Sequence, residues 1–173
     1  MTVVIRAVVD LPGIPPERAF AAMVDLAAQE RWMIGTRLYA IKSPAPAPSV
    51  GSRIAAFTGI GGLGLLDTMT VTAYEPPHRW VVAKDGGLLR GVGTMGVDPT
   101  PAGCRASWSN ELTPPFGSLG RMLAQITAPL AAAALRACLH RLARQLRRGE
   151  LPLSGAGGAT AVPTSPGAPE SER

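Results

Sequence analysis

Three glycines, Gly59, Gly61 and Gly64, repeat the G-x-G-x-x-G spacing of a dinucleotide-binding loop. Such a loop lies between a strand and a helix, because the helix N-terminus holds the pyrophosphate. The preceding "SRIAAFT" suits a strand, but the following "LLDTMTVTAYE" alternates with a period of two and predicts a second strand. The segment therefore predicts a hairpin connection between two strands and argues against a bound nucleotide.

Metal-dependent and covalent catalysis find little support elsewhere in the chain. The two histidines are His78, in a Pro-Pro turn, and His140, beside Arg141. There is no H-x-x-x-H, no C-x-x-C and no dense carboxylate cluster, so we expect no metal site and no cofactor. Cys104 and Cys138 fit buried thiols in a reducing compartment better than a disulfide. Nothing supports a serine or cysteine nucleophile activated by histidine.

The composition is that of one globular domain. The chain has 173 residues, of which 46% are hydrophobic and 17% are charged. This length is enough to bury a sizeable core. Because no run of 18 apolar residues and no signal peptide is recognisable, we expect a cytoplasmic protein without a transmembrane segment.

The net charge of +5 is concentrated in one segment. Residues 118–150 hold six arginines and one glutamate. These arginines fit a solvated helix face, with the last of them near the negative end of the helix dipole. The alternative is a patch that binds nucleic acid or an anionic membrane.

The hydrophobic periodicity changes along the chain and predicts its elements. "TVVIRAVVDL" predicts a strand, and residues 15–32 predict a helix that either continues past Asp25 or breaks there into a second short helix. Residues 36–113 alternate with a period of two and have short connections, which predicts an antiparallel meander. A period of 3.6 returns over residues 118–148, with Ser118 as the N-cap and a kink at Pro129.

The domain is expected to cover residues 1–149. Residues 150–173 consist mainly of Gly, Ala, Pro and Ser and are predicted to be disordered. The long helix is the one predicted element large enough to cover the apolar face of the sheet. The alanines at 131–134 either leave a cavity between the helix and the sheet or let the two pack closely.

At this point the sequence resembles the polyketide cyclase/dehydrase and lipid-transport group of the START-like (SRPBCC) superfamily. The residues that carry the resemblance are "IPPERAFAAMVDLAAQERW", "VTAYEPPHRW" and "GCRASWSNEL", in the same order of elements over about residues 2–148. The resemblance implies an α+β helix-grip fold of the START/Bet v 1 type. In that fold an antiparallel sheet of about six or seven strands curls around a long C-terminal helix, with two short helices after the first strand.

The resemblance implies three classes of function. The first is binding or carriage of a hydrophobic small molecule, such as a lipid, a polyketide or an aromatic compound, in an internal cavity. The second is a polyketide cyclase/dehydratase that uses acid/base residues in the same cavity. The third is an interaction module that uses the arginine-rich end of the helix. We expect a hydrophobic ligand, no nucleic acid, and a monomer or homodimer.

Candidate site residues follow from residue type and predicted face. The expected apolar lining consists of Trp32, Met69, Val71, Met95, Trp108, Met122 and Ile126. Three polar residues, Asp67, Asn110 and Arg90, are candidates for projecting inward. In an enzyme of this family we expect Asp67, or a phenol such as Tyr39 or Tyr74, to move a proton, while Asn110 or Arg90 polarises a carbonyl oxygen. Lys84 and Asp85 are expected in a hairpin turn. The segment from Thr58 to Asp67 is expected to act as a gate for ligand entry.

Overall fold

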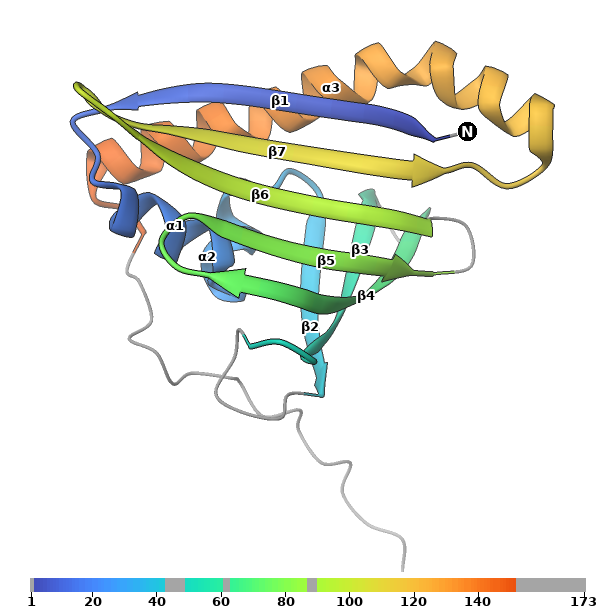
Figure 1. Ribbon diagram of the computed structural model, residues 1–173, viewed down its shortest axis with the longest axis horizontal. Coiled ribbons are helices and arrows are strands. Elements are labelled where there is room, and N and C mark those ends of the chain that lie inside the picture. The colour runs from blue at the N-terminus through green and yellow to red at the C-terminus, as the bar shows by residue number, and fades with distance from the viewer. Residues whose placement is uncertain (1, 43–48, 61–62, 87–89, 152–173) are drawn as a thin grey trace, which may run out of the picture.

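The computed structural model describes residues 2–42, 49–60, 63–86 and 90–151 (Figure 1). The elements, in chain order, are β1 (Val3–Pro12), α1 (Pro16–Val24), α2 (Leu26–Trp32), β2 (Thr36–Lys42), β3 (Arg53–Ile60), β4 (Leu63–Glu75), β5 (Arg79–Asp85), β6 (Arg90–Thr100), β7 (Gly103–Thr113) and α3 (Gly117–Arg148). Gly61 and Gly62, the centre of the expected gate, and residues 152–173, most of the expected tail, lie outside the described residues.

The strands form one antiparallel sheet of seven strands in the order β1-β7-β6-β5-β4-β3-β2. Neighbours from β2 to β7 are joined by short connections, which antiparallel pairing allows, and β1 pairs with β7 along its whole length. Because side chains alternate between the faces of a strand, one face of this sheet carries Leu11, Val71, Trp80, Val97 and Cys104, all of them buried. We call it the inner face. The sheet and its three helices confirm the predicted fold class.

The two short helices are separate, which settles the alternative at Asp25. This residue ends α1 and begins α2, and its side chain accepts a hydrogen bond of 3.0 Å from Ala28 N. A side-chain oxygen in this position satisfies a backbone N–H that the first turn leaves unpaired. The indole N–H of Trp32 donates to Ala22 O at 3.1 Å, which ties the end of α2 back to α1.

The long helix α3 begins earlier than expected. Its N-cap is Phe116, whose φ of 63° turns the chain into the helix without a side-chain hydrogen bond, so the prediction of Ser118 as N-cap was wrong. The helix continues through Pro129, and a kink there stays a prediction. It ends at Gly149, which has a φ of 67° and donates its N–H to Gln145 O and Leu146 O. A left-handed glycine is a common helix stop.

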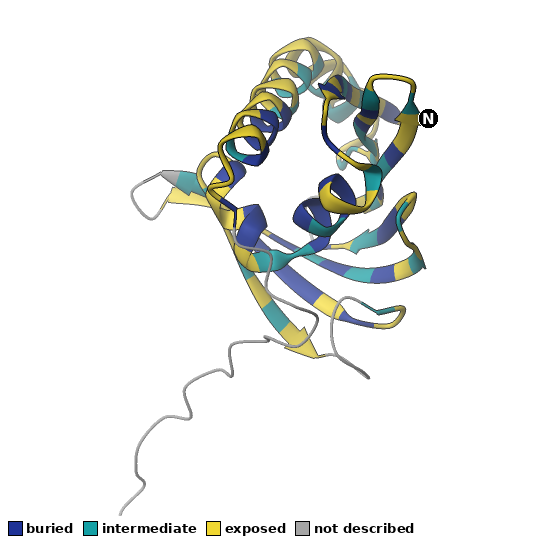
Figure 2. Ribbon diagram, turned by 90° about the vertical axis from the view of Figure 1, so that its left-hand side faces the viewer, coloured by how far each residue is buried: buried dark blue, intermediate teal, exposed yellow. Residues whose placement is uncertain are grey.

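The inner face has two ends that differ in their cover. At one end, the core end, α1, α2 and the second half of α3 (133–148) pack on the sheet (Figure 1). Leu139 and Leu142 of α3 are fully buried there together with Trp32. Figure 2 shows buried residues on the sides of these helices that face the sheet. The opposite end, which we call the far end, carries Asp67 and Asn110.

The side of the first half of α3 (117–132) that faces the sheet carries small side chains together with the half-buried Arg121. Ala124, Ala128, Ala131 and Ala132 are half-buried, whereas the last alanines of the predicted run, 133 and 134, are exposed. The helix packs mainly on the edge strand β1, with fewer contacts to β7 and α2. Within the confirmed fold, α3 lies along the edge of the sheet that β1 forms.

Candidate functional site

Asp67 on β4 and Lys84 on β5 form a buried ion pair at the far end of the inner face. Their side chains are 7% and 11% exposed, and Lys84 Nζ donates a hydrogen bond to Asp67 Oδ2. The second carboxylate oxygen, Asp67 Oδ1, is buried and has no hydrogen-bond partner among the described residues. Because a buried polar atom without a partner costs about 1–3 kcal/mol, a donor from a ligand would be favourable here.

The register of the strands brings these two side chains together. Lys84 lies opposite Met69, and Asp67 is two residues away from Met69 on the same face of β4. This diagonal position is within reach of a long side chain. The expectation of a hairpin turn at Lys84 and Asp85 was wrong, because β5 and β6 stay paired as far as Asp85 and Arg90.

Asn110 on β7 lies near the ion pair, on the other side of β6. Val82, Gly93 and Asn110 are neighbours in the register of β5, β6 and β7. A Cβ atom at Gly93 would lie 3.2 Å from Asn110 Oδ1 and 3.5 Å from Lys84 Cε. The missing side chain of Gly93 thus lets the side chains of β5 and β7 approach each other over β6. We call Asp67, Lys84 and Asn110 the inner cluster.

Most of the expected apolar lining lies on or packs against the same face. Four of these residues are buried, namely Trp32, Met69, Val71 and Met95. Trp108 is half-buried. The rings of Trp32 and Trp108 meet edge to face with their centroids 5.8 Å apart. Trp108 is two residues from Asn110, and Met69 is two residues from Asp67, so both strands place an apolar side chain next to the inner cluster.

Three expected site residues lie away from the inner cluster. Met122 and Ile126 on α3 are 50% and 68% exposed. Arg90 is exposed. Its neighbour Gly91 lies on the inner face with Gly93. Because successive residues of a strand point to opposite faces, the Arg90 side chain lies on the outer face. The site proposed below therefore leaves these three residues out, and its cation is Lys84.

Lys84 was not among the predicted site residues, although the sequence holds a signal for it. Trp80, Val82 and Lys84 alternate along one strand, so Lys84 continues the inner-facing positions of two buried residues. The following "DGG" favours a tight turn at this point and so conceals the inner position of Lys84. Lysine in an inner position next to a buried carboxylate is the pattern that could have found it.

The inner cluster combines three different kinds of polar group in a setting where Asp67 is buried and Lys84 and Asn110 are half-buried. A carboxylate accepts hydrogen bonds or a proton, an ammonium donates them, and an amide does both. Ionic groups act more strongly on a bound molecule where water is excluded. The arrangement can therefore orient a ligand oxygen and, with a suitable substrate, transfer a proton.

Thiol and metal chemistry receive no support from the described residues. Burial raises the pKa of the Cys104 thiol, and the carboxylate of Glu17 adds to this effect. A raised thiol pKa disfavours the thiolate, which is the nucleophilic form. Within the residues that the structure describes, no three side chains of His, Cys, Asp or Glu are grouped so that they could hold a metal ion.

Comparison with protein families decides the relationship of the chain. Residues 2–147 match the family model described as polyketide cyclase / dehydrase and lipid transport. The chain belongs to this family. No curated protein sequence matches it significantly.

Solved structures share the fold of this polyketide cyclase/dehydrase family member at low sequence identity. TTHA0849 from Thermus thermophilus has a TM-score of 0.70 and 16% identity, over 86% of this chain and 100% of its own. CV1439 from Chromobacterium violaceum has a TM-score of 0.62 and 19% identity, over 83% and 96%. The polyketide_cyc-like protein Cgl2372 from Corynebacterium glutamicum has a TM-score of 0.60 and 14% identity, over 87% and 94%. These similarities show the fold.

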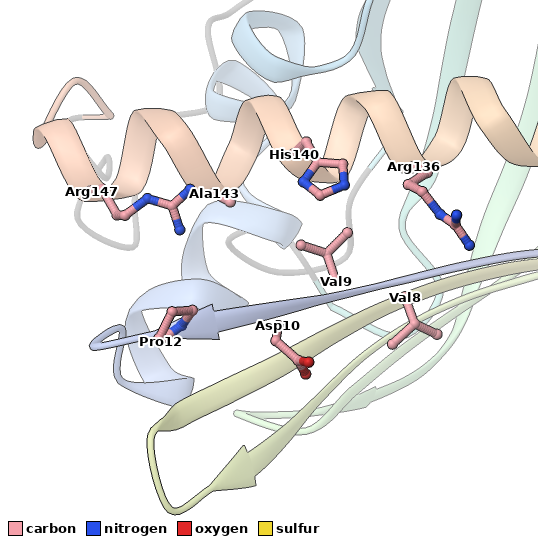
Figure 3. Close-up of a pocket in the computed structure, with 8 residues that line it drawn as sticks. All are labelled: Val8, Val9, Asp10, Pro12, Arg136, His140, Ala143 and Arg147. Carbon is pink, nitrogen blue, oxygen red and sulfur yellow. The ribbon is translucent and has the colours of Figure 1, made fainter.

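This family member also has a groove between β1 and the second half of α3 (Figure 3). Its volume is about 530 Å³, and it is lined by Val8, Val9, Asp10, Pro12, Arg136, His140, Ala143 and Arg147. The Asp10 carboxylate points away from α3 in Figure 3 and accepts a hydrogen bond of 2.6 Å from Arg105 Nε. This bond holds the pKa of Asp10 below its usual value. The helix side of the groove is basic.

Length and composition alone would let α3 cross a membrane. An 18-residue window of this helix has a mean hydropathy of 1.5, and α3 is the one helix in the described part of the chain that reaches this level. The core helices of many proteins pass the same test, and the second half of α3 is such a core helix. However, only 11% of the window is buried.

Proposed function

We propose that this family member binds a small, largely apolar molecule on the inner face at the far end of the sheet. The observation that carries this proposal is the inner cluster, in which a buried carboxylate keeps one oxygen without a partner beside an ammonium and an amide. A few polar groups among apolar side chains are the usual composition of a small-molecule site. The family, described as acting in polyketide cyclisation and lipid transport, supports a hydrophobic ligand.

The inner cluster limits the chemistry of the ligand. Asp67 Oδ1 accepts a hydrogen bond, so its partner is a hydroxyl or N–H donor. Lys84 and the amide group of Asn110 can donate, so a carbonyl or hydroxyl oxygen fits beside them. An apolar body with a hydroxyl group next to a carbonyl oxygen satisfies all three residues. Lipids, polyketides and aromatic compounds can each carry this pair of groups.

Two small aromatic probes that differ in one O–H donor test this proposal. We expect 2-naphthol to bind about tenfold or more tightly than 2-methoxynaphthalene, because a hydrogen bond to a charged group contributes about 1.5–3 kcal/mol. Asp67→Leu/Lys84→Met should remove this preference in a calorimetric or fluorescence titration. Arg90→Gln, on the outer face, is the control and should keep it. A preference that survives the double substitution would contradict the proposed site.

A second candidate function is catalysis of ring closure or dehydration of a poly-β-ketone chain. The ion pair of Asp67 and Lys84 favours it, because it places a base next to a cation. Asp67 would remove a proton from a carbon between two carbonyl groups, and Lys84 or Asn110 would stabilise the resulting enolate oxygen. Binding in a bent conformation would hold that carbon near a second carbonyl carbon.

Product analysis distinguishes catalysis from binding alone. With a poly-β-ketone thioester as the probe, catalysis predicts a cyclised or dehydrated product that is detected by mass spectrometry. Asp67→Asn should lower the turnover by about 10²-fold or more, the size of a general base effect. An unchanged turnover in Asp67→Asn would remove the catalytic role of this residue. Binding without product would leave the first proposal standing.

A further inference from the structure

The first half of α3 carries an exposed row of large apolar side chains. We call this row the apolar stripe; its members are each at least half exposed and are Phe116, Leu119, Met122, Leu123, Ile126 and Leu130. A typical surface helix places such residues toward the core and polar residues toward the solvent. The stripe reverses this arrangement, so its burial requires something other than the described part of the chain.

The apolar stripe points away from the sheet. Ala128 faces the sheet and is half-buried, while Ile126 and Leu130, two positions before and after it, are 68% and 75% exposed. Residues two apart lie on nearly opposite sides of a helix. The stripe extends from Phe116 to Leu130, which is about 21 Å at 1.5 Å per residue.

Arginines continue the same side of the helix beyond the stripe. Arg144 lies 18 residues after Ile126, and Arg148 lies 18 residues after Leu130. Eighteen residues are about five full helical turns, so each arginine lies on the same side of the helix as its apolar counterpart. Arg141, three residues before Arg144, lies on the same side, and all three arginines are exposed. Residues 118–150 contain six arginines and a single acidic residue, Glu150, which pairs with Arg148 at 3.6 Å. One side of α3 therefore has an apolar zone followed by a cationic zone.

We propose that this side of α3 docks on the surface of an anionic phospholipid bilayer. The apolar stripe would enter the boundary between headgroups and acyl chains, and the arginines would contact lipid phosphates. Because the apolar zone lies at the start of the helix, the Phe116 end enters more deeply than the Arg148 end. Leu139, Leu142 and Leu146 are buried against the rest of the chain, so α3 lies on the membrane and does not cross it.

Charge favours a bilayer over a second copy of this chain. Two antiparallel α3 helices centred on Ile126 would cover both apolar stripes, but each cationic zone would then project without an acidic partner on the other helix. An anionic bilayer complements both zones at once, since it offers an apolar layer beneath a layer of phosphates. This inference is independent of the proposed ligand site.

Vesicle flotation of the full chain tests the inference. We expect binding to phosphatidylcholine/phosphatidylglycerol vesicles (3:1), at least tenfold weaker binding to phosphatidylcholine alone, and weaker binding in 0.5 M than in 0.1 M salt, because exposed charges are screened. Arg141→Gln/Arg144→Gln should weaken binding by about 30-fold, at about fivefold for each arginine. The matched control Arg18→Gln/Arg79→Gln removes two exposed arginines elsewhere and should bind like the original.

A second pair of variants tests the apolar stripe. Ile126→Gln/Leu130→Gln should reduce binding by about tenfold or more, because each loses apolar area that the membrane would bury. Leu63→Gln/Leu66→Gln changes two leucines on β4 that are 85% and 58% exposed, and it should bind like the original. All these residues are exposed, and unchanged thermal unfolding would confirm that the variants fold.

Three results would overturn the inference. The first is the absence of flotation with anionic vesicles, and the second is an equal loss of binding in the control variants. The third is a dimer, seen by analytical ultracentrifugation, that Ile126→Gln/Leu130→Gln converts to a monomer while vesicle binding stays unchanged. That third result would assign the stripe to a second copy of the chain.

Discussion

The two halves of α3 have opposite orientations of their apolar side chains. Residues 133–148 turn leucines toward the sheet and arginines toward the solvent, while residues 117–132 turn alanines toward the sheet and large apolar residues outward. The helix is continuous, so the difference lies in the side chains alone. It indicates that the second half stabilises the fold and that the first half is available for contact with another molecule.

The sheet shows the same division between its two ends. At the core end, α1, α2 and the leucines of α3 cover the inner face, and the side chains there are apolar. At the far end, the inner face carries an ion pair and an amide, and the helix beside it contributes small side chains. Apolar packing dominates stability, whereas a buried ion pair contributes little net stability, because the cost of desolvating the two charges offsets their attraction. The far end is therefore the better candidate for function.

The largest effect on stability is expected from breaking the ion pair at the far end. Asp67→Leu leaves the Lys84 ammonium buried without a partner and should lower the free energy of unfolding by about 3–5 kcal/mol. Asp67→Leu/Lys84→Met removes both charges and should recover most of this loss, as seen by urea denaturation. If the double variant is as unstable as the single one, the pair stabilises the fold and the contrast between the two ends fails.

A comparison of two leucines tests the division within α3. Leu142 is fully buried at the core end, and Leu142→Ala should lower the free energy of unfolding by about 2–5 kcal/mol. Leu130, which is 75% exposed, should tolerate the same substitution within about 0.5 kcal/mol. Urea denaturation of both variants under one set of conditions gives the comparison. Similar losses would mean that the first half of α3 is packed in solution.

The sequence was sufficient for the sheet and for the order of elements, and the reason is physical. Alternating residues in 36–113 and short turns leave an antiparallel meander as the simplest arrangement. The inward positions of Asp67 and Asn110 follow from the same alternation. These features depend on neighbouring residues, which a sequence displays directly.

The sequence was not sufficient for the packing of α3. Met122 and Ile126 have helical spacing relative to other apolar residues, but alanines occupy the opposite side of the same turns. In the first half of α3, the periodicity therefore gives two apolar sides, one of alanines and one of large apolar residues. It does not tell which of these two sides packs against the sheet. Lys84 was missed for a related reason, since its contact with Asp67 depends on the length of β5 and on its register with β4.

The thiol at the core end gives a smaller effect that depends on pH. Burial raises the pKa of Cys104 above that of the unfolded chain, and Glu17 adds to the shift. The stabilisation from the neutral thiol is thus complete below the ordinary thiol pKa and is lost as the pH rises through the folded value. We expect the stability of the original chain to fall more steeply above about pH 9 than that of Cys104→Ala. Parallel pH dependences would contradict a buried thiol.

The smallest effect concerns an exposed ion pair, Asp10 with Arg105, which contrasts with the buried pair at the far end. The hydrogen bond from Arg105 lowers the pKa of Asp10. Any stabilisation from this pair is present above the ordinary aspartate pKa and is lost as the pH falls through the lowered value. Solvent screens such a pair, so Arg105→Gln should leave the urea midpoint nearly unchanged near neutral pH. In the same variant, an NMR titration should show the Asp10 midpoint rising toward its ordinary value, with the control Arg18→Gln leaving it in place. A large loss of stability in Arg105→Gln would show instead that this edge of β1 and β7 supports the core end more strongly than its exposure indicates.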